Sequence, residues 1–146
     1  MYRNILFILL ILCCNCREKD TADRENQERI IATLEKETLY FCERDIVRWR
    51  EQWSHEPYVS KMYTGNREFL EFKGWDAIER NTMEHMTRYP DTIPLPKTNM
   101  EYQITLFGET AFVFYSKEGE NGNIRENRFM VKEKGKWKIA RMQTIY

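Results

Sequence analysis

Apolar and polar positions along this chain repeat with different periods, and each period predicts a different element. From about residue 28 to residue 53, apolar residues recur at intervals of three and four, as they do on one face of an α-helix. Charged residues fill most of the remaining positions of this stretch. The pattern therefore predicts a long helix with one broad buried face.

Asp45 is the polar exception on that predicted buried face. An aspartate commonly caps a helix that begins again after a kink, because its side chain accepts a hydrogen bond from a backbone N–H. A carboxylate that points into a cavity would instead be an unpaired acid with a raised pKa, as acid–base chemistry requires. The sequence leaves both interpretations open.

The rest of the chain predicts strands with one further helix. Two short runs rich in aromatic and β-branched residues flank residues 64–66 and predict a hairpin. Residues 74–89 predict a second helix, which Pro90 ends. Four longer runs follow from residue 99, and their short connections predict an antiparallel meander. These connections lie at Gly108–Glu109, at 119–122 and at Gly135.

Composition narrows the classes of protein that this pattern allows. The chain has 146 residues, with 23 Lys and Arg against 23 Asp and Glu. This balance argues against a nucleic-acid-binding protein and against a polybasic membrane-surface module, since both need a basic excess. With 42% apolar and 14% aromatic residues, the chain can fill a core, so disorder of the whole chain is excluded.

The N-terminus has the pattern of an export signal. Residues 1–15 contain one basic residue, Arg3, followed by an apolar run and then by cysteines. The run is too short for a bilayer, which needs about 20 apolar residues, but it suits a secretory signal. The cysteines at its end resemble those of a bacterial lipoprotein signal, which is cut before a cysteine that carries lipid. We predict lipidation at Cys16, with Cys14 as the alternative because Asn15 is unusual just before such a cut.

A polar tether is expected to follow the lipidated cysteine. Residues 16–27 are almost entirely polar and predict a solvated segment between the lipid and a domain of residues 28–146. The protein is then expected in the bacterial cell envelope, on the periplasmic or the surface face of the outer membrane, and joined to the membrane by its N-terminal lipid. Of 4 cysteines, only Cys42 lies in the domain, so neither an internal disulfide nor a cysteine zinc site is expected.

The order of the predicted elements resembles that of the nuclear transport factor 2-like (NTF2-like) superfamily, particularly its SnoaL-like bacterial branch. Three short motifs support the resemblance, which covers residues 28–146: ERDIVRW late in the first helix, GWDAI at the start of the second, and GKWKI before the last strand. The resemblance implies a cone-shaped α+β fold. In it, two short strands and a four-strand meander form a curved antiparallel sheet around a long N-terminal helix and a second helix. It also implies a pocket at the wide end, which family members use for isomerisation, cyclisation, hydrolysis or binding alone.

The favoured hypothesis is a non-catalytic, lipid-anchored module that holds a small apolar ligand or forms a homodimer through its sheet. Several aromatic residues would surround the pocket, where an apolar ligand can stack on them. Period-two alternation places strand residues on two faces, but the sequence does not say which face is concave. The expected pocket-lining residues are Trp49, Trp53, Trp75, Asn127 and Phe129.

The alternative hypothesis is an isomerase, cyclase or hydrolase. Such chemistry needs a carboxylate with a raised pKa beside a hydrogen-bond donor, and the candidates are Asp45 with Tyr63 or Tyr115. The two histidines, His55 and His85, lack the spacing of metal ligands, and no phosphate-binding loop occurs. Neither a metal nor a cofactor is expected.

Overall fold

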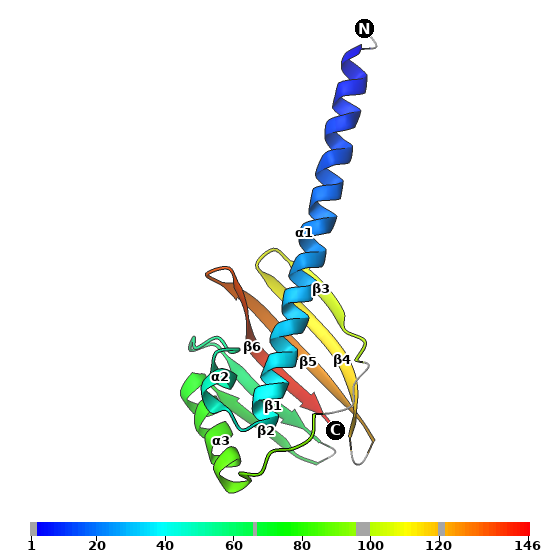
Figure 1. Cartoon of the computed structure of the whole chain (residues 1–146). Helices are drawn as coiled ribbons and strands as arrows, with labels where there is room; N and C mark the ends of the chain where they lie inside the picture. The colour runs from blue at the N-terminus through cyan, green and yellow to red at the C-terminus, as the bar shows by residue number, and fades with distance from the viewer. Residues whose placement is uncertain (1–2, 66, 96–99, 120–121) are drawn as a thin grey trace.

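The computed structural model describes residues 3–65, 67–95, 100–119 and 122–146, with side chains from Asp20 onward. Within these ranges there are three helices and six strands (Figure 1), one helix more than the sequence predicts. The helices are α1 (Arg3–Cys42), α2 (Ile46–Arg50) and α3 (Trp75–Arg88). The strands are β1 (Ser60–Thr64), β2 (Phe69–Lys73), β3 (Gln103–Phe107), β4 (Thr110–Gly119), β5 (Gly122–Glu133) and β6 (Lys136–Ile145). Asn66 and Asn99, which belong to the predicted hairpin turn and to the first long run, lie outside the described residues.

The first predicted helix is two helices, because the chain turns sharply after Cys42. Arg44 has a φ of 62°, a left-handed conformation that a continuing α-helix does not allow. α2 then begins at Ile46, and the side chain of Asp45 accepts a hydrogen bond of 2.9 Å from the backbone N–H of Arg48. Asp45 is therefore the N-cap of α2, which is the first of the two interpretations that the sequence left open.

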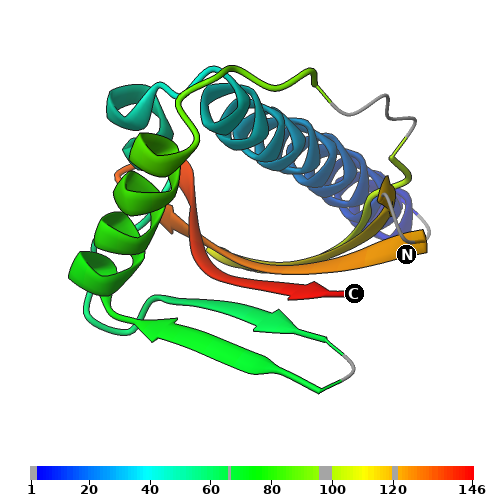
Figure 2. The same cartoon turned by 90° about the horizontal axis from the view of Figure 1, so that it is seen from below.

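The six strands form one curved sheet in the order β2-β1-β6-β5-β4-β3. The meander from β3 to β6 is antiparallel, as predicted, whereas β1 pairs with β6 in parallel, with Ser60 opposite Arg141. A bulge at Phe129/Met130 interrupts the pairing of β5 with β6. Figure 2 shows that the helices cover one face of the sheet and leave its other face open.

The core lies between the helices and the covered, concave face of the sheet. Its largest fully buried side chains include Trp49 and Trp53 from the helical layer and Met130 and Ile139 from the sheet. Burial of such side chains removes apolar surface from water, which is the main favourable term in folding.

The predicted tether is helical, since α1 runs through residues 16–27 and its N-terminal half projects from the domain (Figure 1). Ion pairs one turn apart, Arg24 with Glu28 and Arg29 with Glu25, support the polar part of this helix. Asn26 accepts hydrogen bonds from Lys132 and Trp137 at 3.0 and 3.1 Å, so contact with the sheet already begins inside the predicted tether. No helix in the described residues has an apolar stretch long enough to cross a bilayer.

Candidate functional site

The alternation of side chains along β4 and β5 decides which residues face the concave interior. On β4, Val113 and Tyr115 are buried, and the register pairs them with Arg128 and Glu126 of β5, which are buried as well. Residues two apart on a strand share a face, so Asn127 lies on the opposite, open face. Phe129 also lies there, with its ring 5.0 Å from that of exposed Phe112. The prediction that Asn127 and Phe129 line the concave pocket is therefore wrong.

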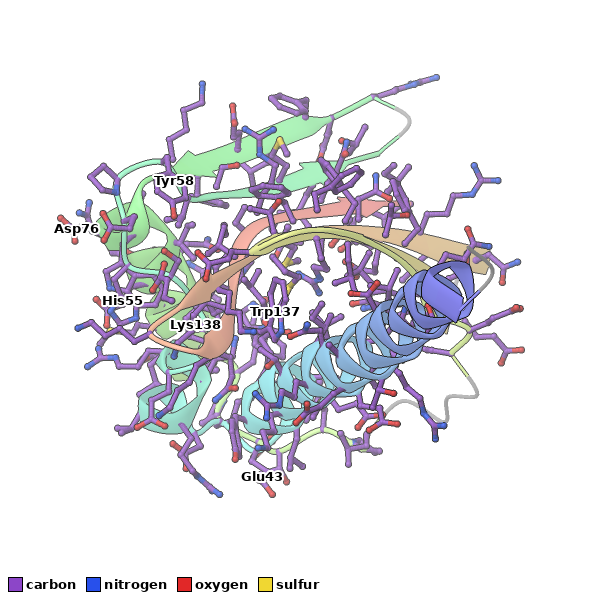
Figure 3. All side chains as sticks on the ribbon, turned by 90° about the horizontal axis from the view of Figure 1, so that it is seen from above. Glu43, His55, Tyr58, Asp76, Trp137 and Lys138 are labelled. Carbon is purple, nitrogen blue, oxygen red and sulfur yellow. The ribbon has the colours of Figure 1, made fainter. Side chains whose placement is uncertain are left out.

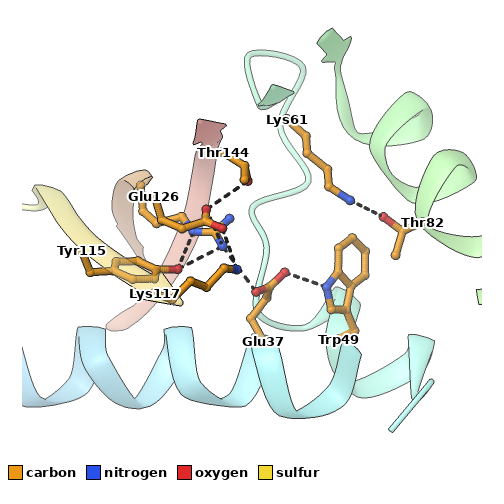
Figure 4. Close-up of polar contacts among 9 residues, drawn as sticks. Glu37, Trp49, Lys61, Thr82, Tyr115, Lys117, Glu126 and Thr144 are labelled. Atoms are coloured by element: carbon orange, nitrogen blue, oxygen red, sulfur yellow. Dashed lines mark hydrogen bonds and ion pairs between the residues drawn. The ribbon is translucent and has the colours of Figure 1, made fainter. Parts of the chain in front are cut away.

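Glu37, Tyr115 and Glu126 come together in a polar cluster in this interior (Figure 4). Arg128 contacts all three and is the centre of the cluster. Its side chain is 3% exposed, and its Nη2 lies 3.3 Å from Oε2 of Glu126 and 3.9 Å from Oε2 of Glu37. Its Nε and Nη2 donate to the hydroxyl of Tyr115 at 3.2 and 3.1 Å. Its Nη1 is buried and has no hydrogen-bond partner among the described residues.

Both carboxylates of this cluster are held by further donors. Glu126 forms an ion pair of 2.8 Å with Lys117 and accepts a hydrogen bond of 3.1 Å from the hydroxyl of Thr144. Glu37, on α1, accepts a hydrogen bond of 2.8 Å from the indole N–H of Trp49. We call Glu37, Tyr115, Lys117, Glu126, Arg128 and Thr144 the interior cluster.

Lys61 of β1 is a buried amine beside the interior cluster. Its Nζ donates to the hydroxyl of Thr82 at 3.1 Å and lies over the rings of Trp49 and Tyr63. Among the described residues, no carboxylate forms an ion pair with it. Burial lowers the pKa of Lys61 to about 8, and the charge of Arg128 acts in the same direction.

Tyr102 extends the interior cluster beyond Tyr115. Its ring lies 5.0 Å from that of Tyr115, and its buried hydroxyl has no hydrogen-bond partner in the described part of the chain. Burial, together with the charge of Glu35, raises the pKa of Tyr102 to about 12. Glu35 also lines a hollow of about 400 Å³ between α1 and the segment before β3. The apolar part of its wall comes from Ala32, Leu39, Leu95 and Met100.

Asp45 does not belong to this site. Its carboxylate contacts the backbone and the side chain of Arg48, and these hydrogen bonds hold its pKa below the usual value. No contact joins it to Tyr63 or Tyr115 among the residues described. An acid with a lowered pKa is a poor proton donor or acceptor near neutral pH, so the structure contradicts the catalytic role predicted for Asp45.

The two predicted tyrosines lie in different places. Tyr115 belongs to the interior cluster, whereas Tyr63 stacks on Tyr146 at a centroid distance of 6.4 Å and contacts Lys61. Burial raises the pKa of both hydroxyls, so both are neutral near pH 7.

The three predicted tryptophans pack on one another. Trp49 and Trp53 are fully buried, and Trp75 stacks on Trp49 at 6.0 Å and on His55 at 4.0 Å. The indole of Trp53 keeps an unpartnered N–H in the described part of the chain. Of the three tryptophans, Trp49 contacts the candidate site: it donates a hydrogen bond to Glu37, and the amine of Lys61 lies over its ring.

Glu37, Lys61, Glu126 and Arg128 were not predicted from the sequence. For Glu37 a signal exists, because it follows Ile30 and Leu34 at helical spacing on the buried face of α1. The inward positions of β5 give no such signal, since two of them are charged. No group of three or more metal-ligating side chains occurs in the described residues.

Comparison with known proteins extends this picture. No protein-family model and no curated protein sequence matches the chain. Among solved structures, it is similar to an NTF2-like protein of unknown function from Shewanella oneidensis, with 16% identity and a TM-score of 0.57 over 83% of this chain and 99% of that one. A second NTF2-like protein of unknown function, from Silicibacter pomeroyi, shares 12% identity with a TM-score of 0.60 over 84% and 96%.

A third similar structure is a candidate dehydratase of the NTF2-like family from Streptomyces avermitilis. It shares 10% identity, with a TM-score of 0.64 over 84% of this chain and 96% of that one. Identities this low show the fold alone. The chain has the α+β fold of NTF2-like proteins, with a curved, unclosed sheet around its helices.

Proposed function

We propose that the protein is a ligand-binding module that holds a small molecule with an apolar body and one carboxylate or similar oxygen group. The observation that carries the proposal is Nη1 of Arg128, a buried donor without a described partner. Leaving such a donor unpaired costs about 1–3 kcal/mol, and more when the group is charged. An oxygen atom of a ligand would remove this cost.

The charges of the interior favour an anionic group. Two carboxylates, Glu37 and Glu126, face the cations Arg128 and Lys117, and Lys61 adds a third cation below a pH of about 8. The interior therefore has one more positive than negative charge at neutral pH. A ligand carboxylate would balance it without any rearrangement of the existing pairs.

The hollow lined by Glu35 supports an apolar body for the ligand. Leu39, Leu95 and Met100 give it apolar walls, and its volume of about 400 Å³ is within the range of small-molecule pockets. The ring of Tyr102 packs on that of Tyr115, whose hydroxyl accepts from Arg128, and the unpartnered hydroxyl of Tyr102 would be a second donor to the ligand oxygen.

A matched pair of probes tests this proposal. Decanoate and decanol differ in their head group, so titration calorimetry should show that decanoate binds and that decanol binds at least about tenfold more weakly. Tyr102→Phe should weaken decanoate by about tenfold. Tyr58→Phe removes an exposed hydroxyl away from the site and should change nothing. Equal binding of the two probes, or no binding of either, would refute the proposal.

We also propose that the module is lipid-anchored in the cell envelope. The short apolar run from Ile5 to Leu12 and the cysteines after it support this localisation. The helical segment between Cys16 and Asn26 would then act as a spacer. At a rise of about 1.5 Å per residue, it would separate the lipid from the first contact with the sheet by about 15 Å.

The open face of the sheet favours a second role, as a homodimer. Phe107, Phe112 and Phe114 are 44–59% exposed, and the rings of Phe107, Phe114 and Phe129 all lie within 6.5 Å of that of Phe112. The register places Thr105 opposite Phe112 and Asn127 opposite Phe114, and it places exposed Arg141 opposite Phe129 at one side of this phenylalanine patch. Two copies could bring Phe112 and its neighbours together with Arg141 left at the edge of the interface.

A further inference from the structure

A second feature of the molecule, separate from the interior cluster, is a basic groove. It has a volume of about 710 Å³ and lies between α1 and the hairpin that joins β5 to β6. Arg29 and Lys36 line it from α1, and Lys136 and Lys138 line it from the hairpin. Glu51 is the single acidic residue among the lining residues, although the whole chain has equal numbers of acids and bases.

The cations of the basic groove are poorly neutralised. Lys36 and Lys136 form no ion pair with any described residue, and Lys138 donates to the backbone carbonyl of Glu51 rather than to a carboxylate. Arg29 pairs with Glu25, one turn earlier on its own exposed helix face. Burial lowers the pKa of Lys138. Repulsion from the charge of Lys136, on the same hairpin, lowers it further.

The walls of the basic groove are held in place by the fold. Lys134 and Gly135 have φ angles of 49° and 77°, as in the two-residue turns that match the twist of a hairpin. Trp137 lies between the hairpin and α1 (Figure 3), where its indole N–H donates to Asn26 and its carbonyl accepts from Thr33 at 3.4 Å. The backbone of the two walls is therefore fixed, so binding of a common anion has to order only the lysine side chains.

We propose that the basic groove binds a small multivalent anion of the phosphate class. An anion with two or more charged oxygens could contact Lys36 from one wall and Lys136 from the other, and it would relieve the repulsion between Lys136 and Lys138. No residue of the groove belongs to the interior cluster, although Ala32 and Lys36 line both the groove and the hollow of about 400 Å³. Lys136 lines the groove alone, so Lys136→Gln should weaken the anion and leave decanoate binding unchanged.

Titration of the full chain with inorganic pyrophosphate tests the proposal. Pyrophosphate should bind, and increasing salt should weaken it. The double variant Lys36→Gln/Lys136→Gln should weaken it by at least about tenfold. Lys134→Gln is the matched control, since it removes one charge from the same hairpin but does not line the groove; it should change the affinity by less than about twofold.

A second probe separates the two sources of phosphate chemistry. If the anion is a lipid headgroup, the protein should bind vesicles that contain phosphatidylglycerol rather than pyrophosphate. The double variant should then bind these vesicles at least about tenfold more weakly. The proposal fails if neither probe binds, or if Lys134→Gln weakens binding as much as the double variant does. Circular dichroism spectra of the variants should match that of the parent chain, because the substituted lysines are exposed.

Discussion

Arg128 and Glu126 lie two positions apart on β5, and both side chains point into the concave interior, with Nη2 of the arginine 3.3 Å from Oε2 of the glutamate. A buried pair of this kind contributes little net stability, but loss of one partner leaves the other charge buried without compensation. We expect Arg128→Met to lower the free energy of unfolding by about 3 kcal/mol. Arg125→Met, on the exposed face of the same strand, should change it by less than about 0.5 kcal/mol. Urea denaturation measures both; similar losses in the two variants would contradict the central place given to Arg128.

Lys61 makes stability depend on pH in a window set by its pKa. The pKa is lowered from 10.5 to about 8 in the folded protein, so between these values the unfolded chain binds more protons. Stability therefore rises with pH, and this contribution should amount to about 1 kcal/mol between pH 8 and pH 9. Urea denaturation at pH 8 and pH 9 measures the free energy of unfolding of the parent chain and of Lys61→Met. The parent chain should gain about 1 kcal/mol more than the variant between these pH values, because all other groups titrate alike in both. An equal change of the free energy of unfolding with pH in both proteins would show that Lys61 has an ordinary pKa.

Asp45 should act on stability alone. Asp45→Ala removes the cap of α2 and should destabilise the protein by about 1 kcal/mol, whereas Asp45→Asn should retain most of the stability because asparagine caps equally well. Thermal unfolding measures both. Binding of decanoate should be the same in both variants and the parent chain, and a loss of binding in Asp45→Asn would restore a role for this residue in the site.

The phenylalanine patch should govern self-association. Light scattering of the chain without residues 1–16 should give the mass of a dimer. Phe112→Lys should give the mass of a monomer, because burying a charge at the centre of an apolar interface has a high free-energy cost. Val47→Lys places the same charge on exposed α2, in the helical layer, and should leave the dimer intact. A monomeric parent chain at high concentration would exclude this interface.

Lipidation should depend on a single cysteine. In a bacterial host, Cys16→Ser should abolish incorporation of labelled fatty acid and release the protein from the detergent phase, because without lipid the chain lacks its anchor. Cys14→Ser should leave both properties unchanged. The reverse result would assign the lipid to Cys14. If neither the parent chain nor a variant incorporates the labelled fatty acid, the protein has no lipid anchor.

The elements could be predicted because their hydrophobic periods are clear. Of the interior cluster only Tyr115 was a candidate, and its partners Glu126 and Arg128 could not be predicted because β5 has no clear hydrophobic period. Along β5, the inward positions are Ile124, Glu126, Arg128 and Met130, and the outward positions are Arg125, Asn127, Phe129 and Val131. Each face has two apolar residues, so alternation cannot identify the buried one. The error on Asn127 and Phe129 follows directly from this symmetry.

Long-range pairing was the second feature that local pattern could not provide. β1 and β6 are about 80 residues apart, and their period-two pattern is the same for parallel and antiparallel neighbours. Asp45 was a different case: the sequence offered both a cap and a buried acid. The left-handed turn at Arg44 and the hydrogen bond that Asp45 accepts from the backbone N–H of Arg48 distinguish them.

One unbroken helix carries both the projecting N-terminal half and Glu37. Each residue of an α-helix turns the chain by about 100°, so the number of residues before Asn26 sets the direction in which the N-terminal end faces relative to the sheet. Insertion of one residue there would swing that end around the helix axis by about 100° and leave every contact of the domain in place. For a chain anchored as we propose, the length of α1 would thus set the orientation of the domain relative to the membrane.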